Sequence, residues 1–286
     1  MKAFGLPLAA GIVLAGLAPA AAQTLTIGLK SEATSMDPLF HQLSTNIQVS
    51  KNIFEALTTQ DALQMVTPGL AESWEAVDDT TWRFKLRQGV KFHDGSDFTA
   101  RDVIYSFCRV PLVQNSPSAY TIFTGGIADM AAEDDHTLTI TTKATNPLLP
   151  VDLWSLAILS ADALGADDQV TYGPDGTCEG MGDVPQAPAF NDPAVAVGTG
   201  PYVLDRYTRG SEVVVTRFDD YWGGRPPLER IRFVEVPEVA SRVNGLLSGE
   251  YDFACDLPPD QIATVAAAPG LEVQSSTIWN HRITVF

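Results

Sequence analysis

Residues able to do acid–base or metal chemistry are scattered in this sequence. It has four histidines, and none stands near a cysteine at metal-ligand spacing. His93-Asp94-Gly95 follows a predicted strand, where Asp and Gly favour a turn, so a turn is preferred over a base or a metal ligand. Acidic pairs such as Asp134-Asp135 and Asp219-Asp220 also fall in predicted turns. The sequence lacks the G-x-S-x-G, H-E-x-x-H, P-loop and G-x-G-x-x-G patterns, so no catalytic site, cofactor or metal is predicted.

Cysteine chemistry is limited to Cys108, Cys178 and Cys255. An odd number allows at most one internal disulfide and leaves one thiol over. No two of them form a C-x-x-C pair, which argues against a zinc site.

The composition is that of a globular protein with a strongly acidic surface. Of 286 residues, 45% are hydrophobic and 19% are charged, which excludes a mostly disordered chain. The net charge of −17 repels phosphate backbones and anionic lipids, so nucleic acid is not predicted as a partner. The length suggests about two domains.

The first 22 residues have the pattern of a secretory signal peptide. Lys2 precedes an apolar stretch over 6–17 that is too short to span a bilayer, and Ala20-Ala21-Ala22 supplies small residues before Gln23. We expect cleavage after Ala22 and an exported protein. A buried N-terminal helix is the alternative.

Apolar periodicity predicts the elements of the first two thirds of the chain. Alternation indicates strands, and apolar residues at helical spacing indicate helices. Residues 165–197 are rich in Asp, Gly and Pro, and we interpret them as a long surface excursion at a domain boundary. The predicted elements are strands at 24–29, 82–86 and 136–142, helices at 44–57 and after the N-cap Thr99, and a hairpin of 202–208 with 212–218.

The last eighty residues alternate strand and helix patterns. Predicted strands at 231–236, 251–255 and 271–274 are separated by predicted helices at 239–247 and 260–267. This order is typical of parallel strands joined by right-handed crossovers, so the fold class is α/β.

A series of short motifs carries a family resemblance. In order they are NIFEAL at 52–57, PGLAESW at 68–74, TWRFKLRQGVKFHDG at 81–95, FTARDV at 98–103, GTGPY at 198–202, YWG at 221–223 and GEYD at 249–252. The series resembles extracellular solute-binding protein family 5, the peptide- and nickel-binding receptors of bacterial ABC importers. The physical roles of the motifs are mainly structural, since their aromatic residues fill cores and their glycines free turns.

The resemblance implies a periplasmic-binding-protein-like fold (class II, peptide-binding type). It assigns residues 23–50 and 190–286 to a discontinuous base lobe and residues 51–189 to an inserted domain. Chains of the family run to roughly five hundred residues, so we expect this one to be truncated before the closing lobe. The alternation over 283–286, which ends without a turn or polar tail, agrees with that expectation.

The resemblance also implies a periplasmic, monomeric receptor, not an enzyme, that delivers a di- or oligopeptide to ABC permease subunits. Nickel chelate, haem and glutathione are alternative ligands. Ligand-binding candidates follow Asp37-Pro38 or come from the inserted domain: Phe40, His41, Thr45, Tyr120, Phe123 and Trp154. Core packing is the alternative role for each, and His41 lacks a second metal ligand. Rival functions are a secreted hydrolase that uses acidic residues and a chaperone-like protein.

The implied domains also suggest a disulfide pairing. Cys108 and Cys178 both fall in the inserted domain, whereas Cys255 falls on a predicted strand of the base lobe. We therefore predict a Cys108–Cys178 disulfide and a free, buried and inert Cys255. Three free thiols are the alternative. The pairing requires Cα atoms within about 7 Å.

Overall fold

The structure, a computed structural model, describes residues 24–173 and 176–274. The predicted signal peptide at 1–22 and the predicted strand at 283–286 lie outside these residues. No helix in the described part is long and apolar enough to cross a membrane.

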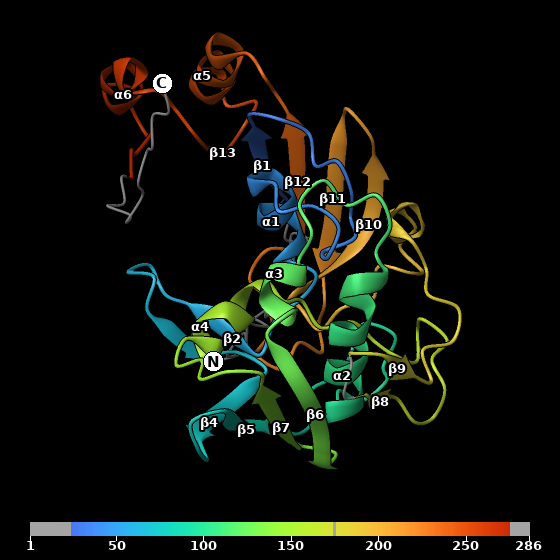
Figure 1. The fold of residues 1–286 in the computed structure, drawn as a ribbon. Coiled ribbons are helices and arrows are strands. Elements are labelled where there is room, and N and C mark those ends of the chain that lie inside the picture. Colours follow the sequence, from blue (N-terminus) through green and yellow to red (C-terminus); the bar gives the residue numbers. More distant parts are fainter. Residues whose placement is uncertain (1–23, 174–175, 275–286) are drawn as a thin grey trace, which may run out of the picture.

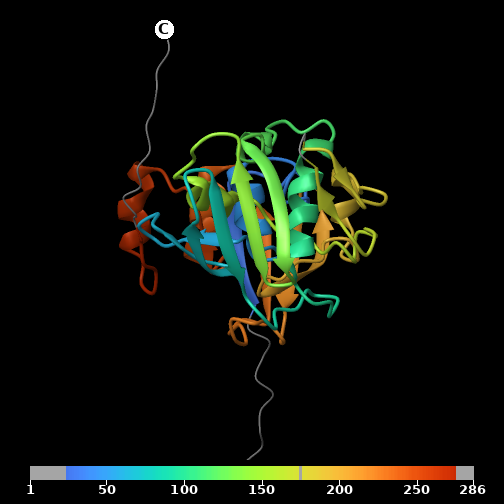
Figure 2. The ribbon, with the colours of Figure 1, turned by 60° about the horizontal axis from the view of Figure 1, so that its bottom comes forward.

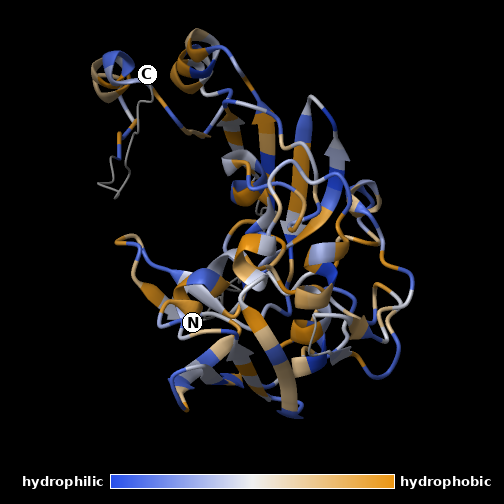
Figure 3. Ribbon diagram, viewed as in Figure 1, coloured by the Kyte–Doolittle hydropathy of each residue, from blue (hydrophilic) through white to orange (hydrophobic). Residues whose placement is uncertain are grey.

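A mixed sheet lies within the region predicted as the base lobe (Figure 1). In the described part its strands follow the spatial order β10 (Tyr202–Thr208), β11 (Glu212–Arg217), β12 (Arg230–Glu235), β1 (Thr24–Leu29) and β13 (Phe253–Ala254). The predicted hairpin is confirmed as β10 and β11, which pair antiparallel. The apolar stretches of β10, β11 and β12 are orange in Figure 3. Val215 of β11 and Ile231 and Phe233 of β12 are buried.

The predicted parallel pairing is confirmed with one change of partner. β12 and β13 are joined through helix α5 (Val239–Ser248), and each pairs with β1, which lies between them. Helix α6 (Pro259–Ala266) follows β13. The predicted strand at 271–274 is wrong, since no regular structure forms there. Leu271 and Val273 instead pack against a small apolar cluster beside α5, so their alternation serves packing and not strand pairing.

The inserted part contains an antiparallel sheet with helix α2 (Ala100–Arg109) beside it (Figure 2). Its strand order is β4 (Ala71–Ala76), β5 (Thr81–Leu86), β7 (Thr137–Thr142) and β6 (Ile127–Asp134). The remaining short elements of the described chain are α1 (Ser44–Ser50), β2 (Thr58–Gln60), β3 (Val66–Pro68), η1 (Val110–Leu112), α3 (Thr121–Thr124), α4 (Leu149–Asp152), η2 (Leu153–Ser155), β8 (Thr171–Tyr172), β9 (Cys178–Glu179) and η3 (Ala187–Asn191).

The helix predicted over 44–57 ends at Ser50. Beyond a turn, the backbone of this segment bonds to distant segments: the carbonyl of Glu55 accepts from Ile158 N–H at 2.8 Å, and that of Ala56 accepts from Leu70 N–H at 2.9 Å. Tertiary hydrogen bonds thus replace the helical ones, although the apolar residues Val49, Ile53, Phe54 and Leu57 of this segment are buried.

The segment 165–197 is only partly a surface excursion. It forms the β8–β9 hairpin and the 3₁₀ helix η3, and Phe190 and Ala196 are fully buried. The expected surface excursion is therefore present only in part, because a few apolar residues anchor the segment to the core.

One apolar core runs through both proposed domains. It contains Leu29 and Phe233 of the base sheet together with Phe84 and Ile140 of the inserted sheet. The division into 23–50 with 190–286 and 51–189 stays a prediction.

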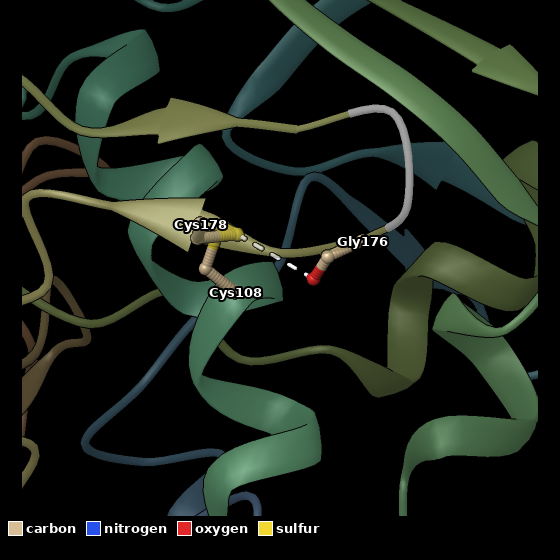
Figure 4. Close-up of a disulfide and its surroundings, with 3 residues drawn as sticks. All are labelled: Cys108, Gly176 and Cys178. Atoms are coloured by element: carbon tan, nitrogen blue, oxygen red, sulfur yellow. Dashed lines mark hydrogen bonds between the residues drawn. A yellow bond between two sulfur atoms is a disulfide. The ribbon is translucent and has the colours of Figure 1, made fainter.

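Cys108 and Cys178 form a disulfide that ties α2 to β9 (Figure 4). Their Cα atoms are 5.9 Å apart, inside the limit required by the predicted pairing. The Cys178 sulfur also lies 4.0 Å from the Gly176 carbonyl oxygen, a contact and not a hydrogen bond, because a disulfide sulfur carries no hydrogen. Cys255 is half-buried, so the prediction that it is buried is wrong. It directly follows β13, an edge strand of two residues. What burial it has still raises the pKa of the Cys255 thiol, which lowers its reactivity at neutral pH.

Candidate functional site

A pocket of about 520 Å³ is lined by residues of both the proposed inserted domain and the proposed base lobe. Its walls come from α1 and the turn after it, the β2–β3 hairpin, the start of α3, and η2. In Figure 1 these elements lie near one another around α3 and α4. The loop after β11 adds Tyr221 and Trp222. The pocket is therefore built from segments far apart in the sequence.

Three of the predicted site residues line this pocket together. Tyr120 directly precedes α3 and Phe123 lies one turn later, with ring centroids 6.1 Å apart. Trp154 reaches the pocket from η2. Burial raises the pKa of Tyr120 to about 12, so its hydroxyl stays neutral. These side chains give the pocket a largely apolar wall with polar edges, which suits a small organic solute.

The other three predicted residues, Phe40, His41 and Thr45, do not line the pocket. The Thr45 side chain is 1% exposed and donates a hydrogen bond to the Glu32 carbonyl at 3.0 Å. His41 Nδ1 lies 3.2 Å from the Thr34 hydroxyl oxygen. Their neighbours Pro38 and Gln42 do line it, so the segment borders the pocket, and its role in ligand binding stays a prediction.

The pocket also contains a carboxylate that was not among the predicted site residues. Glu55 accepts hydrogen bonds from Tyr221 Oη at 2.8 Å, Trp222 Nε1 at 2.7 Å and Thr199 Oγ1 at 3.0 Å. The NIFEAL, GTGPY and YWG motifs thus meet at one side chain. The order of these motifs along the chain was the sequence signal for this part of the site. The spacing of the motifs does not indicate that they meet at Glu55.

Two opposing influences act on the charge of Glu55. Burial raises its pKa above the ordinary value, while its three donors and the nearby Arg87 lower it. Arg87 stacks over the Trp222 ring at 4.4 Å and donates from Nε to the Gly69 carbonyl at 2.7 Å. Glu55 therefore fixes the orientation of the aromatic residues on this side of the pocket.

Lys51 is the cationic side chain of the pocket lining in the described part. Its Nζ lies 3.7 Å from the centroid of the Trp154 ring and donates to the Trp154 carbonyl at 3.5 Å. Partial removal from water lowers the pKa of Lys51 to about 8.

Nothing in the described residues has the composition of a metal centre: residues 24–173 and 176–274 contain no group of three His, Cys, Asp or Glu side chains placed to hold an ion. His93 lies outside the pocket, where its Nε2 is 2.9 Å from the Gly200 carbonyl oxygen and its Nδ1 accepts from Gly198 N–H at 3.3 Å. The turn predicted at His93-Asp94-Gly95 is confirmed by Gly95, whose φ of 89° favours glycine.

The family of this chain follows from comparison with known proteins. The model described as "Bacterial extracellular solute-binding proteins, family 5 Middle" matches residues 65–286. The chain belongs to family 5 of the bacterial extracellular solute-binding proteins. The predicted family is thereby confirmed.

Relatives within family 5 include proteins named for small peptides. The chain is 30% identical to the dipeptide-binding protein of Escherichia coli K12, over 88% of this chain and 46% of that protein. It is also 30% identical to the glutathione-binding protein GsiB of Escherichia coli O1:K1, over 93% of this chain and 50% of that protein. The chain thus spans about half the length of these relatives.

A solved structure shows the same fold. The oligopeptide-binding protein AppA from Bacillus subtilis, in complex with a nonapeptide, superposes with a TM-score of 0.72 at 23% identity, covering 87% of this chain and 47% of that one. The predicted periplasmic-binding-protein-like α/β fold is therefore confirmed.

Proposed function

We propose that this chain forms one wall of the ligand site of a periplasmic receptor, which captures a di- or oligopeptide and delivers it to the permease of an ABC importer. The pocket lined by Tyr120, Phe123 and Trp154 carries the proposal, because it offers aromatic surface with polar groups at its edge. Membership of family 5 and the peptide-binding names of the relatives support it. The solute is bound and not transformed, in keeping with the lack of a catalytic motif.

The 286-residue chain by itself is proposed to bind its solute weakly. Tight binding of small solutes depends on enclosure of most of the ligand surface. Lys51, one of the lining residues, is exposed to solvent, so the pocket is open at that point. We expect a dissociation constant on the order of 1 mM, which corresponds to about −4 kcal/mol.

Weak binding is tested by two-dimensional NMR titration of the ¹⁵N-labelled chain with dipeptides, tripeptides and glutathione. Shifts are expected at the indole N–H groups of Trp154 and Trp222, with the indole of Trp74, outside the pocket, as an internal control. Micromolar affinity would contradict the weak binding proposed for this chain. The lack of any shift with every solute would overturn solute binding in this pocket.

Pocket residues are tested against core residues by alanine substitution. Phe40→Ala, outside the pocket lining, is expected to weaken peptide binding without lowering the thermal midpoint if the residue contacts the solute. Tyr120→Ala removes a buried ring of the core and is expected to lower both. Equal losses of binding and of stability would favour a packing role. Because Tyr120 is only 4% exposed, Tyr120→Phe is the milder companion that keeps the ring and removes the hydroxyl.

A further inference from the structure

The two charged side chains that line the pocket in the described part differ in how their charges are matched. Glu55 accepts three hydrogen bonds and lies near Arg87, so its negative charge is balanced within the wall. Lys51 has no carboxylate within 4 Å among residues 24–173 and 176–274. The unmatched charge of the pocket is therefore positive, although the chain as a whole carries a net charge of −17.

The surroundings of Lys51 leave room for an anionic partner. Its ammonium group has three N–H donors, and one of them reaches the Trp154 carbonyl at 3.5 Å. The Trp154 ring face, 3.7 Å from Nζ, attracts the cation and removes water from it without supplying a negative charge. A carboxylate beside Nζ would replace the lost water and compensate the charge.

The pocket that Lys51 lines also has apolar walls. Tyr120 and Phe123 line the same pocket, and their rings lie 6.1 Å apart. A ligand that places a carboxylate on Lys51 would therefore have aromatic surface available for an apolar group attached nearby.

We propose that Lys51 and Trp154 form a subsite for the carboxylate of the solute, with an apolar group of that solute against Tyr120 and Phe123. This inference rests on the proposed function and narrows the solute to an acid. Its carboxylate could belong to the C-terminus of a peptide or to an acidic side chain, and the two sources share the same chemistry at Lys51.

The experiment compares matched peptides by NMR titration of the full 286-residue chain. Ala-Phe is compared with Ala-Phe-amide, which has the same size and lacks the terminal carboxylate, and with Glu-Phe-amide, which has only a side-chain carboxylate. For an ion pair at a partly exposed pocket edge we expect Ala-Phe to bind about fivefold tighter than its amide. A similar preference for Glu-Phe-amide over Ala-Phe-amide would identify the side chain as the source.

Three variants locate the effect. Lys51→Met keeps the length of the side chain and is expected to remove the preference for the acid, while Lys51→Arg is expected to retain it. Lys85→Met is the matched control: it removes the same charge from an exposed position on β5, outside the pocket, and is expected to leave the preference unchanged.

The outcomes separate this inference from the proposed function. If the wild-type chain binds peptides but Lys51→Met keeps the full preference for the acid, the carboxylate subsite is wrong and the proposed function stands. An equal loss of preference in Lys85→Met would assign the effect to net charge and also overturn the subsite. If no peptide binds the wild-type chain at any concentration up to 20 mM, the proposed function and the subsite fail together.

Discussion

Helices α2 and α6 are similar in length but differ in how many of their residues are buried. Of the ten residues of α2, nine are buried. Of the eight described residues of α6, only Val265 is buried. Helices this short are marginal in water by themselves, so contacts with the rest of the chain decide their stability. The comparison teaches that stabilising contacts are concentrated at α2 and sparse at α6.

The two helices also differ at their ends. α2 begins at an N-cap bonded to Asp102, carries the disulfide at Cys108, and ends at Arg109 in a buried ion pair. α6 begins at Pro259 after Pro258, with no side-chain cap, and contributes Val265 to a cluster of five buried residues beside α5. Each contact at α2 can be removed singly to test how much of this difference it accounts for.

The largest loss is expected from Arg109→Met. The Arg109 guanidinium donates to both carboxylate oxygens of Asp37, at 3.0 and 2.7 Å, and neither side chain is exposed. The variant leaves Asp37 buried without its counter-charge, which costs about 3–5 kcal/mol. Urea unfolding measures the loss.

An exposed ion pair serves as the control for this result. Arg83 Nε lies 2.9 Å from Glu133 Oε1, but both side chains are more than a third exposed. Arg83→Met is therefore expected to cost far less stability than Arg109→Met, because solvent screens an exposed ion pair. A loss at Arg109 no larger than the loss at Arg83 would show that burial does not distinguish the two sites.

The next loss is expected from removal of the disulfide in a Cys108→Ser, Cys178→Ser double variant. The disulfide closes a loop between residues 70 positions apart, and the chain-entropy model assigns it about 4 kcal/mol. Unfolding under non-reducing conditions measures the difference. The Cys255→Ser variant, which leaves the disulfide intact, is the control.

Thiol titration tests the pairing directly. Denatured, non-reduced protein is expected to show one thiol, that of Cys255, and reduced protein three. Three thiols before reduction would disprove the disulfide.

The sequence was most informative where local pattern and tertiary structure agree. The N-cap Thr99 correctly predicted the start of α2, and alternation correctly placed β1 and β7. These signals depend on neighbouring residues only, so they can be interpreted without knowledge of distant contacts.

The predictions that failed did so because of contacts between distant parts of the chain. The helix after Ser44 ends early because the carbonyl of Glu55 bonds to Ile158, about a hundred residues away. The strand expected at Leu271 is absent because that residue packs on the α5 cluster. Likewise, Glu55 was not predicted as a site residue because its three donors come from residues 199 to 222, which only the fold brings together.

A smaller, pH-dependent effect is expected at Asp102. Burial raises the pKa of this carboxyl from 3.8 to about 6. Since its folded pKa lies above its unfolded value, its contribution to stability is fully present below pH 4 and is lost as the pH rises through 6, by at most about 3 kcal/mol. Asp102→Asn cannot titrate, so its unfolding free energy is expected to lack this part of the slope between pH 4 and 6.

The difference between wild type and Asp102→Asn isolates this group, because burial also raises the pKa of Glu55 and its titration is common to both proteins. Identical slopes in the two proteins would show that Asp102 titrates as it does in the unfolded chain. The ionised carboxylate of Asp102, at the start of α2, would then not destabilise the folded protein at neutral pH.

The smallest and most local effect is expected from Val265→Ala in α6. Removing two methyl groups from the only buried side chain of this helix costs about 1.5 kcal/mol of local contact energy. Because α6 is joined to the rest of the described chain through the small cluster, the loss is expected as faster amide hydrogen exchange within 259–267, with little change in the global unfolding midpoint. Ile262→Ala removes more carbon from the same helix at an exposed position, so it is expected to leave exchange unchanged. If the global unfolding midpoint falls by as much as the lost contact energy at Val265 predicts, α6 unfolds together with α2. The two helices would then differ in burial and not in stability.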